Sequence, residues 1–541
     1  MKHVTCGIFL VINLSILTFT IDTAQAQRDL PDETTITADE LTSPLQHNPR
    51  PISLEEVIQL TVQNNLNIKI VEYDQDIARY GIGAAYGIFD PTLYMSYERR
   101  ESEEKNLSSL NMGPITIPGY GTIELGSSSP PVVHNTEKVF VASLSQLLPT
   151  GAVLSLSYNA TRFQTNNQSV LAMNPYYSNR ATLSAKQPLL RNAGSFVTKS
   201  GIYISQITQQ ITDDVHQGVV IDILAQSIKT YWDLVFAVYN YEVHKVSLQQ
   251  AEELLRTNRI KYEAGVLPAT DVLQAEAQVA ARQDQIILAE KIIYDLSDAL
   301  KKIMNISRTS NEWQLTLVPR DTLLTFEKQP VDEEKALVNA ALFRPDYAAL
   351  QKEREINDIQ KRVAKNQVFP ELNIYGAYGF SGTDNHYSSS IDELETLDYN
   401  NWQAGIEFIF PILNRKARNE LKQAESLAEK TDTRLSDLEQ TIRLDVRNAI
   451  RRVRTNLDRI PITRKRVEFE TAKLNDEQRR YEVGVATIQD VLQFQTDLAN
   501  ARALYLRAIT NYLQSLVELQ QVTGTILRDL GIEIQPTAPQ D

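Results

Sequence analysis

The chain has 541 residues, of which 42% are hydrophobic and 23% charged, and its formal net charge is −14. This acidic balance argues against nucleic acid as a partner, because phosphate binding needs clustered basic side chains. The single cysteine, Cys6, and six scattered histidines exclude a disulfide framework and disfavour a metal site, so we expect no cofactor. After the first 26 residues no apolar run reaches the roughly 18 residues of a transmembrane helix.

Residues 1–26 have the pattern of a secretory signal peptide. Lys2 precedes an apolar run over 4–21, and Ala24-Gln25-Ala26 is a small-residue cleavage site. The alternative, an N-terminal membrane anchor, fits less well because no stop-transfer pattern follows. We therefore expect an exported protein that continues with a polar N-terminal arm over 27–50.

The next 140 or so residues change from helical to strand-like character. A helix is predicted over 51–90, where Ser53 and Glu56 have the spacing of a capping box and Asp90-Pro91 ends the run. Four strand-like segments follow within 91–190, with long polar stretches between them and a tight turn at Pro149-Thr150-Gly151. They are 93–98, 139–148, 152–160 and 181–189.

A second set of elements repeats this order later in the chain. A helix is predicted over 332–369 and two strands within 370–411, at 372–380 and 402–410. In the last strand Trp402, Ile406 and Phe408 share a face opposite Gln403 and Glu407. Segments of about ten residues with alternating polarity and aromatic ends are typical of a membrane β-barrel. For any one segment, an ordinary antiparallel sheet remains the alternative.

Long helices dominate the rest of the chain. Two coiled-coil hairpins are predicted, over 195–305 and 412–529, and their return helices keep a seven-residue apolar period. In the first hairpin the rows are Val272, Val279, Ile286, Ile293, Leu300 and, beside it, Leu273, Ala280, Ile287, Tyr294. Pro461 is expected to kink or break the second outgoing helix. A linker over 306–331 and a tail over 530–541 complete the chain.

The two hairpins turn with nearly the same sequence. Residues 262–278 and 481–497 share eight of seventeen positions in the pattern Y-x-x-G-x-x-x-x-x-D-V-L. Such an internal repeat dictates the architecture. With these two turns, the chain resembles the TolC family of outer-membrane efflux proteins from about residue 51 to about residue 529.

The resemblance implies a fold that is mainly α with a membrane β-barrel portion, built from a tandem repeat of helix, strands and long helical hairpin. It implies a homotrimer that forms a shared β-barrel in the lipid of the Gram-negative outer membrane and an α-barrel across the periplasm. The partners would be a periplasmic adaptor protein and an inner-membrane transporter, and the activity would be conduction rather than catalysis. The family pattern is four strands per protomer, whereas the first repeat here offers four and the second two. The additional hairpin around Pro149-Thr150-Gly151 would either widen the barrel or lie outside it, and we expect the family's four strands as the minimum.

The resemblance also places functional residues at the two turns. The adaptor-facing tips would be Gly265, Val266, Leu267, Pro268 and Gly484, Val485, Ala486. The constriction of the channel would contain Asp490, Gln493, Asp271, Tyr481 and Tyr262, with a hydrogen bond from Tyr481 to Asp271. Gln493 and Ala486 depart from the acidic and basic residues that the family often has there. The alternative is that both aspartates only stabilise helix starts.

Two other classes of function remain as alternatives. A structural coiled-coil or adhesin-type trimer in the periplasm would explain the heptads but not the aromatic strand pairs. An exported enzyme would need a convergent polar site, and the sequence contains no nucleophile–base pair or phosphate loop. Drug, metal and protein substrates all remain compatible with a channel of this kind.

Overall fold

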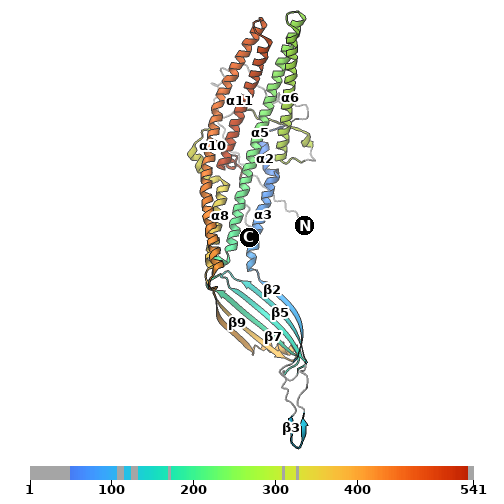
Figure 1. Ribbon diagram of the computed structural model, residues 1–541, viewed down its shortest axis with the longest axis vertical. Coiled ribbons are helices and arrows are strands. Elements are labelled where there is room, and N and C mark those ends of the chain that lie inside the picture. Colours follow the sequence, from blue (N-terminus) through green and yellow to red (C-terminus); the bar gives the residue numbers. More distant parts are fainter. Residues whose placement is uncertain are drawn as a thin grey trace. The chain divides into compact units, whose positions relative to one another are not determined.

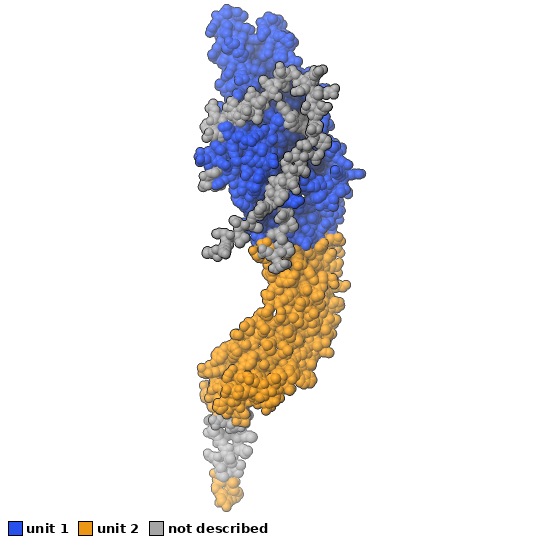
Figure 2. Space-filling model, turned by 180° about the vertical axis from the view of Figure 1, so that it is seen from behind, with its two compact units in different colours: residues 1–78, 209–353, 432–541 blue, residues 79–208, 354–431 orange. Residues whose placement is uncertain are grey.

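The computed structural model describes residues 49–105, 115–123, 132–167, 172–307, 311–323 and 328–533. The predicted signal peptide, nearly all of the predicted arm and the residues after 533 lie outside this described part. The chain divides into two compact units, coloured separately in Figure 2. Unit 1 comprises 1–78, 209–353 and 432–541, and unit 2 comprises 79–208 and 354–431.

Helices form most of the structure (Figure 1). Their bounds are α2 Leu54–Asn64, α3 Leu66–Tyr86, α4 Ser195–Thr198, α5 Ser200–Glu263, α6 Ala269–Ile303, α7 Glu333–Phe343, α8 Pro345–Gln367, α9 Tyr387–Thr396, α10 Arg415–Glu482, α11 Ile488–Thr523 and α12 Ile526–Asp529. Short 3₁₀ turns occur at Gly87–Phe89 and Asn311–Gln314. None of the helices in the described part combines the length and the apolar character that a membrane span requires.

Two helices that the sequence predicts as continuous are each broken. The first breaks at Asn65, whose Nδ2 donates to the Ile303 carbonyl (2.7 Å) and whose Oδ1 accepts from the N–H of Asn67 (2.8 Å). The second breaks at Arg344, because the residue before Pro345 is pushed out of the helical region. The predicted break at Pro461 is wrong, since α10 continues through it.

The core of unit 1 is formed where the hairpins meet the linker. β1 (Pro49–Ile52) pairs in parallel with β8 (Thr316–Pro319). Leu317, Val318 and Leu323 of the linker are at most 1% exposed and pack in one cluster with Tyr231 of α5 and Tyr512 of α11. The described part of the predicted linker is therefore built into the helical core.

Unit 2 contains one six-stranded antiparallel sheet in the order β10-β9-β7-β6-β5-β2. Four of its strands are labelled in Figure 1. The strands are β2 Thr92–Lys105, β5 Val132–Leu147, β6 Val153–Thr165, β7 Tyr176–Pro188, β9 Glu371–Asp384 and β10 Asn400–Ile409. A small hairpin of β3 (Ile115–Ile117) and β4 (Gly121–Ile123) forms a separate sheet. The strands are longer than the predicted segments because their polar outer halves continue the ladders.

The two faces of this sheet differ sharply in polarity. Residues that pair directly across the ladders share a face, and one face carries an apolar band that crosses all six strands. Its large members are exposed: Leu93, Met95, Tyr97, Phe140, Leu144, Leu154, Leu156, Leu183, Ile374, Tyr378, Trp402, Ile406 and Phe408. The opposite face is mostly polar, with members such as Ser96, Ser143, Ser157, Thr182, Asn373 and Gln403. The alternation predicted for β10 is confirmed by this register.

Candidate gate at the hairpin turns

The first hairpin reverses at a glycine in the left-handed conformation. α5 ends at Glu263, and Gly265 has φ +72°. The Gly265 N–H donates to the Tyr262 carbonyl and the Val266 N–H to the Lys261 carbonyl, both at 2.9 Å. These two bonds form a Schellman motif. Because no atom lies within 4 Å of a Cβ added at Gly265, its conformation alone requires glycine.

The second hairpin reverses in the same way. Gly484 has φ +78°, and its N–H donates to the Tyr481 carbonyl at 3.2 Å. The Val485 N–H donates to the Arg480 carbonyl at 2.8 Å, and the Ala486 N–H reaches the same oxygen at 3.3 Å. The repeated sequence thus produces a repeated backbone geometry.

The first turn presents one valine to solvent and the second presents two, since Val483 before Gly484 is also 74% exposed. Val266 is 70% exposed and Val485 68% exposed. Leu267 and Ala486 are half-buried, and Pro268 is exposed where it begins α6. The predicted tip residues therefore form two small, largely apolar surfaces of similar composition.

The helices that follow the turns begin differently. In α11, Thr487 is the N-cap, and its hydroxyl accepts from the Asp490 N–H (3.3 Å) while the Asp490 carboxylate accepts from the Thr487 N–H (3.1 Å). This is a complete capping box. In α6 the N-cap is Pro268, whose side chain cannot accept a hydrogen bond. Asp271 lies in the first turn of α6 without a capping box. Asp490 is therefore held in place by its cap more firmly than Asp271.

The cap also affects ionisation. Hydrogen bonds from the Thr487 hydroxyl and N–H, with the positive charge of Arg480, hold the pKa of Asp490 below its ordinary value. A carboxylate that accepts several hydrogen bonds is stabilised in its charged form. Asp490 is thus anionic over the whole physiological pH range.

A buried hydrogen bond joins the two hairpins near their turns. The Tyr481 hydroxyl of α10 donates to Asn258 Oδ1 of α5 at 2.7 Å, and Lys261 Nζ lies 4.6 Å from the centroid of the tyrosine ring. The predicted bond from Tyr481 to Asp271 is wrong, because the single hydroxyl proton is used by Asn258. Burial and, at longer range, the charge of Asp271 raise the pKa of Tyr481.

The other predicted constriction residues lie on exposed surfaces. Tyr262, the repeat counterpart of Tyr481, is 48% exposed. Gln493 is exposed and donates to Asp497 within α11 at 3.0 Å. Within this chain the structure therefore brings Tyr481 into the packed interface of the two hairpins and leaves Tyr262 and Gln493 outside it.

Two arginines add contacts that the sequence does not reveal. Arg282 of α6 is 4% exposed, and its guanidinium donates to Thr496 Oγ1 of α11 at 2.5 Å, which links the two hairpins. Arg259 of α5 pairs with Glu276 of α6 at 2.7 Å, which ties the first hairpin together. Arg259 and Glu276 lie close to the first repeat motif, but their pairing depends on how α5 and α6 pack.

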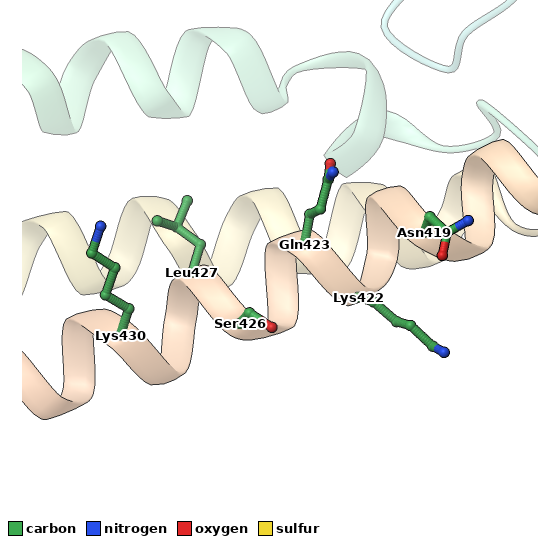
Figure 3. Close-up of a pocket in the computed structure, with 6 residues that line it drawn as sticks. All are labelled: Asn419, Lys422, Gln423, Ser426, Leu427 and Lys430. Atoms are coloured by element: carbon green, nitrogen blue, oxygen red, sulfur yellow. The ribbon is translucent and has the colours of Figure 1, made fainter.

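The surface hollow on α10 does not provide a second candidate site. A hollow of about 510 Å³ near the start of α10 is lined by one helix only, and Figure 3 shows Lys422 pointing away from Gln423 and Leu427. Side chains that diverge along a single helix cannot surround a ligand. Within the described ranges, no three His, Cys, Asp or Glu side chains are grouped closely enough to hold a metal ion.

Comparison with known proteins identifies the family. The family model described as "Outer membrane efflux protein" matches residues 144–305 and 336–525, which is more than half of the chain. The chain belongs to this outer membrane efflux protein family. It is accordingly a protein of the Gram-negative outer membrane, and the resemblance noted from the two turns is confirmed.

The curated relatives are distant. The outer membrane protein TolC of Vibrio cholerae is 23% identical over 302 residues, which cover 55% of this chain and 66% of the relative. TolC of Escherichia coli strain K12 is 26% identical over 277 residues, covering 49% and 54%. The matched part thus spans between about half and two thirds of the length of these relatives.

Solved channels share the fold over a longer stretch. The CmeC outer membrane channel of Campylobacter jejuni matches with a TM-score of 0.61 at 15% identity, covering 87% of this chain and 85% of the channel. VceC of Vibrio cholerae matches with a TM-score of 0.61 at 14% identity, covering 87% and 96%. At these identities the likeness concerns the fold alone.

Proposed function

We propose that this efflux-family protein forms a homotrimeric exit duct that crosses the outer membrane and the periplasm. It would work with a periplasmic adaptor protein and an inner-membrane transporter, as the family resemblance implies. One observation carries the proposal: a sheet with one apolar and one polar face belongs to the same chain as two hairpins with matching turns. The sheet suits a lipid-facing wall around a wet lumen, and the hairpins suit a helical tunnel.

The internal repeat supports a ring of copies. Equivalent positions in the two hairpins are 219 residues apart, as in Tyr262 and Tyr481. The α11 row is buried or half-buried: Leu492, Ala499, Leu506 and Leu513. The equivalent α6 row is exposed: Leu273, Ala280, Ile287 and Tyr294. The α11 row is thus covered within the chain, whereas the equivalent α6 row is exposed to solvent. We infer that another copy of the chain covers the α6 row.

The neighbour of α11 within the chain shows what the missing partner would be. Beside its covered row, Arg507 Nη1 lies 2.7 Å from Asp233 Oδ1, and the Gln514 amide donates to the Lys229 carbonyl at 3.0 Å, both on α5. We infer that α6 receives the second hairpin of another copy in the equivalent way. Such head-to-tail contacts join unlike surfaces, and they form a closed ring when the rotation closes.

The turns are the proposed gate and adaptor contact. Gly265, Val266, Leu267 and Pro268 with Gly484, Val485 and Ala486 would meet the adaptor. Asp490, repeated in every protomer, would line the narrowest point and favour cations, as carboxylate rings do in pores. Asp271, Tyr262 and Gln493 would line the same constriction, and Tyr481 would hold the hairpins together behind it.

Two substitutions at Asp490 separate its charge from its capping role. Asp490→Asn removes the charge but keeps an oxygen for the Thr487 N–H, whereas Asp490→Ala removes both. We expect small, cation-selective single-channel openings for the wild type in a planar bilayer, and loss of selectivity in both variants. Only Asp490→Ala should also loosen the start of α11, seen as faster hydrogen exchange there.

Each outcome has a clear meaning. No conductance from a folded trimer would contradict the duct and favour a structural coiled-coil trimer. Unchanged selectivity in Asp490→Asn would leave the duct proposal intact. It would limit the role of Asp490 to stabilising the start of α11. The absence of enzymatic chemistry follows from the same proposal, because conduction requires no reacting group.

A further inference from the structure

The six-stranded sheet has two unpaired edges. β2 ends the sheet on one side and β10 on the other, and neither edge has a strand partner within the described residues. Because every neighbouring pair is antiparallel and the number of strands is even, β2 and β10 run in opposite directions. An edge of one sheet can therefore continue the antiparallel pattern of a second, identical sheet.

Physical chemistry requires these edges to be paired if the apolar band faces lipid. Each backbone N–H or C=O left without a partner in hydrocarbon costs several kcal/mol, so open sheet edges do not occur there. The band reaches both edges, with Leu93 and Met95 on β2 and Ile406 and Phe408 on β10, all at least 60% exposed. Six strands are fewer than the eight or so of the smallest closed barrels. One copy therefore cannot close on itself.

We propose that three copies join β2 of each protomer to β10 of the next and close an 18-stranded ring. This inference rests on the trimer of the proposed function and goes beyond it. The family pattern of four strands per protomer would give 12. The additional pair is not an appendage, because β5 and β6 lie between β2 and β7 in the same sheet.

The central strands carry the same two-faced pattern as the edges. Leu144 pairs with Leu93 on one side and with Leu156 on the other, and Leu156 in turn pairs with Leu183. These four leucines form one apolar row across β2, β5, β6 and β7. A hairpin outside the wall would not need this continuity of its apolar face with both neighbours.

A ring of 18 strands changes the width of the duct at the membrane. Barrel diameter grows roughly in proportion to strand number at similar tilt. The β-portion would therefore be about one and a half times as wide as a 12-stranded one. The β-portion would then impose little restriction on substrate size, which leaves the hairpin turns as the sieve.

Disulfide trapping tests the ring in the full chain. Cys6→Ser removes the only native cysteine. In this background, Ser96→Cys on the polar face of β2 is combined in turn with Asn401→Cys, Gln403→Cys or Glu407→Cys on the polar face of β10. After mild oxidation, at least one combination is expected to give covalent dimers and trimers, and no larger species, on non-reducing gels.

Matched pairs control for proximity and for strand number. Ser96→Cys with Ala404→Cys places the two thiols on opposite faces and should give no trimer. Ser96→Cys with Ser178→Cys or with Thr182→Cys tests whether β2 lies beside β7, as it would if β5 and β6 were outside a 12-stranded wall. With β5 and β6 in between, neither pair should form a bond within a protomer.

The outcomes separate the two proposals. If the native trimer forms a β2–β7 disulfide, or forms none of the β2–β10 disulfides, the 18-stranded ring is contradicted. The proposed duct is not contradicted by either result. Failure to form a trimer on native gels, with the chain correctly inserted, contradicts the proposed function itself.

Discussion

The Tyr481 hydroxyl donates a 2.7 Å hydrogen bond to Asn258 Oδ1 and so joins two hairpins whose bonded residues are 223 positions apart in the chain. Both residues are buried, and among the described residues Asn258 Nδ2 has no hydrogen-bond partner. Tyr481→Phe would therefore leave a buried amide wholly unpaired, which costs about 1–3 kcal/mol. We expect amide hydrogen exchange in residues 476–490 to become roughly ten- to hundredfold faster.

The repeat supplies the control for this variant. Tyr262→Phe changes the equivalent residue of the first hairpin, whose ring is half exposed and makes no such bond to any of the described residues. Exchange near the second turn should stay at the wild-type rate. Equal effects of both substitutions would show that the hydroxyl of Tyr481 is not what holds the hairpins together.

Alkaline pH should weaken the same contact. Burial and the charge of Asp271 raise the pKa of Tyr481 above its ordinary value of 10.0. A raised folded-state pKa means that this stabilisation is complete below pH 10 and is lost as the pH rises through the folded-state value. Wild-type exchange at the turn should accelerate more steeply above pH 10 than that of Tyr481→Phe, after correction for intrinsic rates. Parallel pH profiles would contradict this assignment.

The sequence predicts features of this molecule that depend on local conformation. Gly265 and Gly484 were predictable because a reversal between antiparallel helices needs left-handed dihedrals, and Asp490 because charge at a helix start is a local effect. The partner of Tyr481 was not predictable, since it depends on how two long helices are rotated against each other. Nothing in the sequence around Asn65 indicates a break, because the break is stabilised by the distant Ile303 carbonyl.

The sheet illustrates a second limit of prediction. Alternation identified the apolar halves of the strands, but residues 99–105 of β2 are almost all charged or polar and gave no strand signal. They are strand because β5 pairs with them along their whole length. Whether β5 and β6 belonged to the same wall as the other four strands was likewise a question of pairing, which polarity alone does not answer.

Acid should not abolish the proposed cation selectivity until the pH is unusually low. The cap from Thr487 holds the pKa of Asp490 below 3.8, so the carboxylate remains charged where an ordinary one begins to titrate. The stabilisation of the α11 start is present above the unfolded-state pKa and is lost as the pH falls through the folded-state value. Reversal potentials in a salt gradient should stay constant from pH 7 to about pH 4.5.

Removing the cap tests the cause of this behaviour. In Thr487→Val the carboxylate loses the hydroxyl partner but keeps the backbone N–H, so its pKa should rise towards the ordinary value. Selectivity of Thr487→Val should then fade at a higher pH than in the wild type. The same pH dependence in both proteins would mean that the cap does not set the charge of Asp490.

Alanine substitutions at two glycines with nearly equal φ angles should destabilise the fold to different extents. Gly484 (φ +78°) has no atom within 4 Å of an added Cβ, so Gly484→Ala should cost only the left-handed penalty of about 1–2 kcal/mol. Gly524 (φ +71°) ends α11, and an added Cβ would lie 2.3 Å from the Phe343 carbonyl oxygen. Gly524→Ala should add about 1–3 kcal/mol for overpacking. Thermal unfolding of the purified protein measures both, and equal shifts of the midpoint would contradict the close approach to Phe343.

The helix α9 packs so closely against β9 at Gly382 that no larger side chain fits between them. A Cβ at Gly382 of β9 would lie 2.1 Å from the Ser390 carbonyl oxygen and 2.6 Å from the Leu394 nitrogen, both backbone atoms of α9. Ser390 Oγ also accepts from Asn179 Nδ2 of β7 at 2.6 Å, which fixes the helix over the polar end of the apolar face. Because backbone atoms cannot rotate away, Gly382→Ala should displace α9 and break this bond.

Proteolysis of the intact protein measures the displacement. We expect new cleavage between residues 385 and 399 in Gly382→Ala, since a loosened segment becomes accessible to protease. Gly376→Ala, on the same strand and face, is the matched control, because its added Cβ would meet only the Gln403 carbonyl oxygen at 3.7 Å. Asn179→Ala should reproduce the cleavage more weakly, because it removes the bond to Ser390 without a steric clash. Cleavage in Gly376→Ala equal to that in Gly382→Ala would instead mean that any added methyl group on β9 disturbs the sheet, and that α9 is not held by the close fit at Gly382.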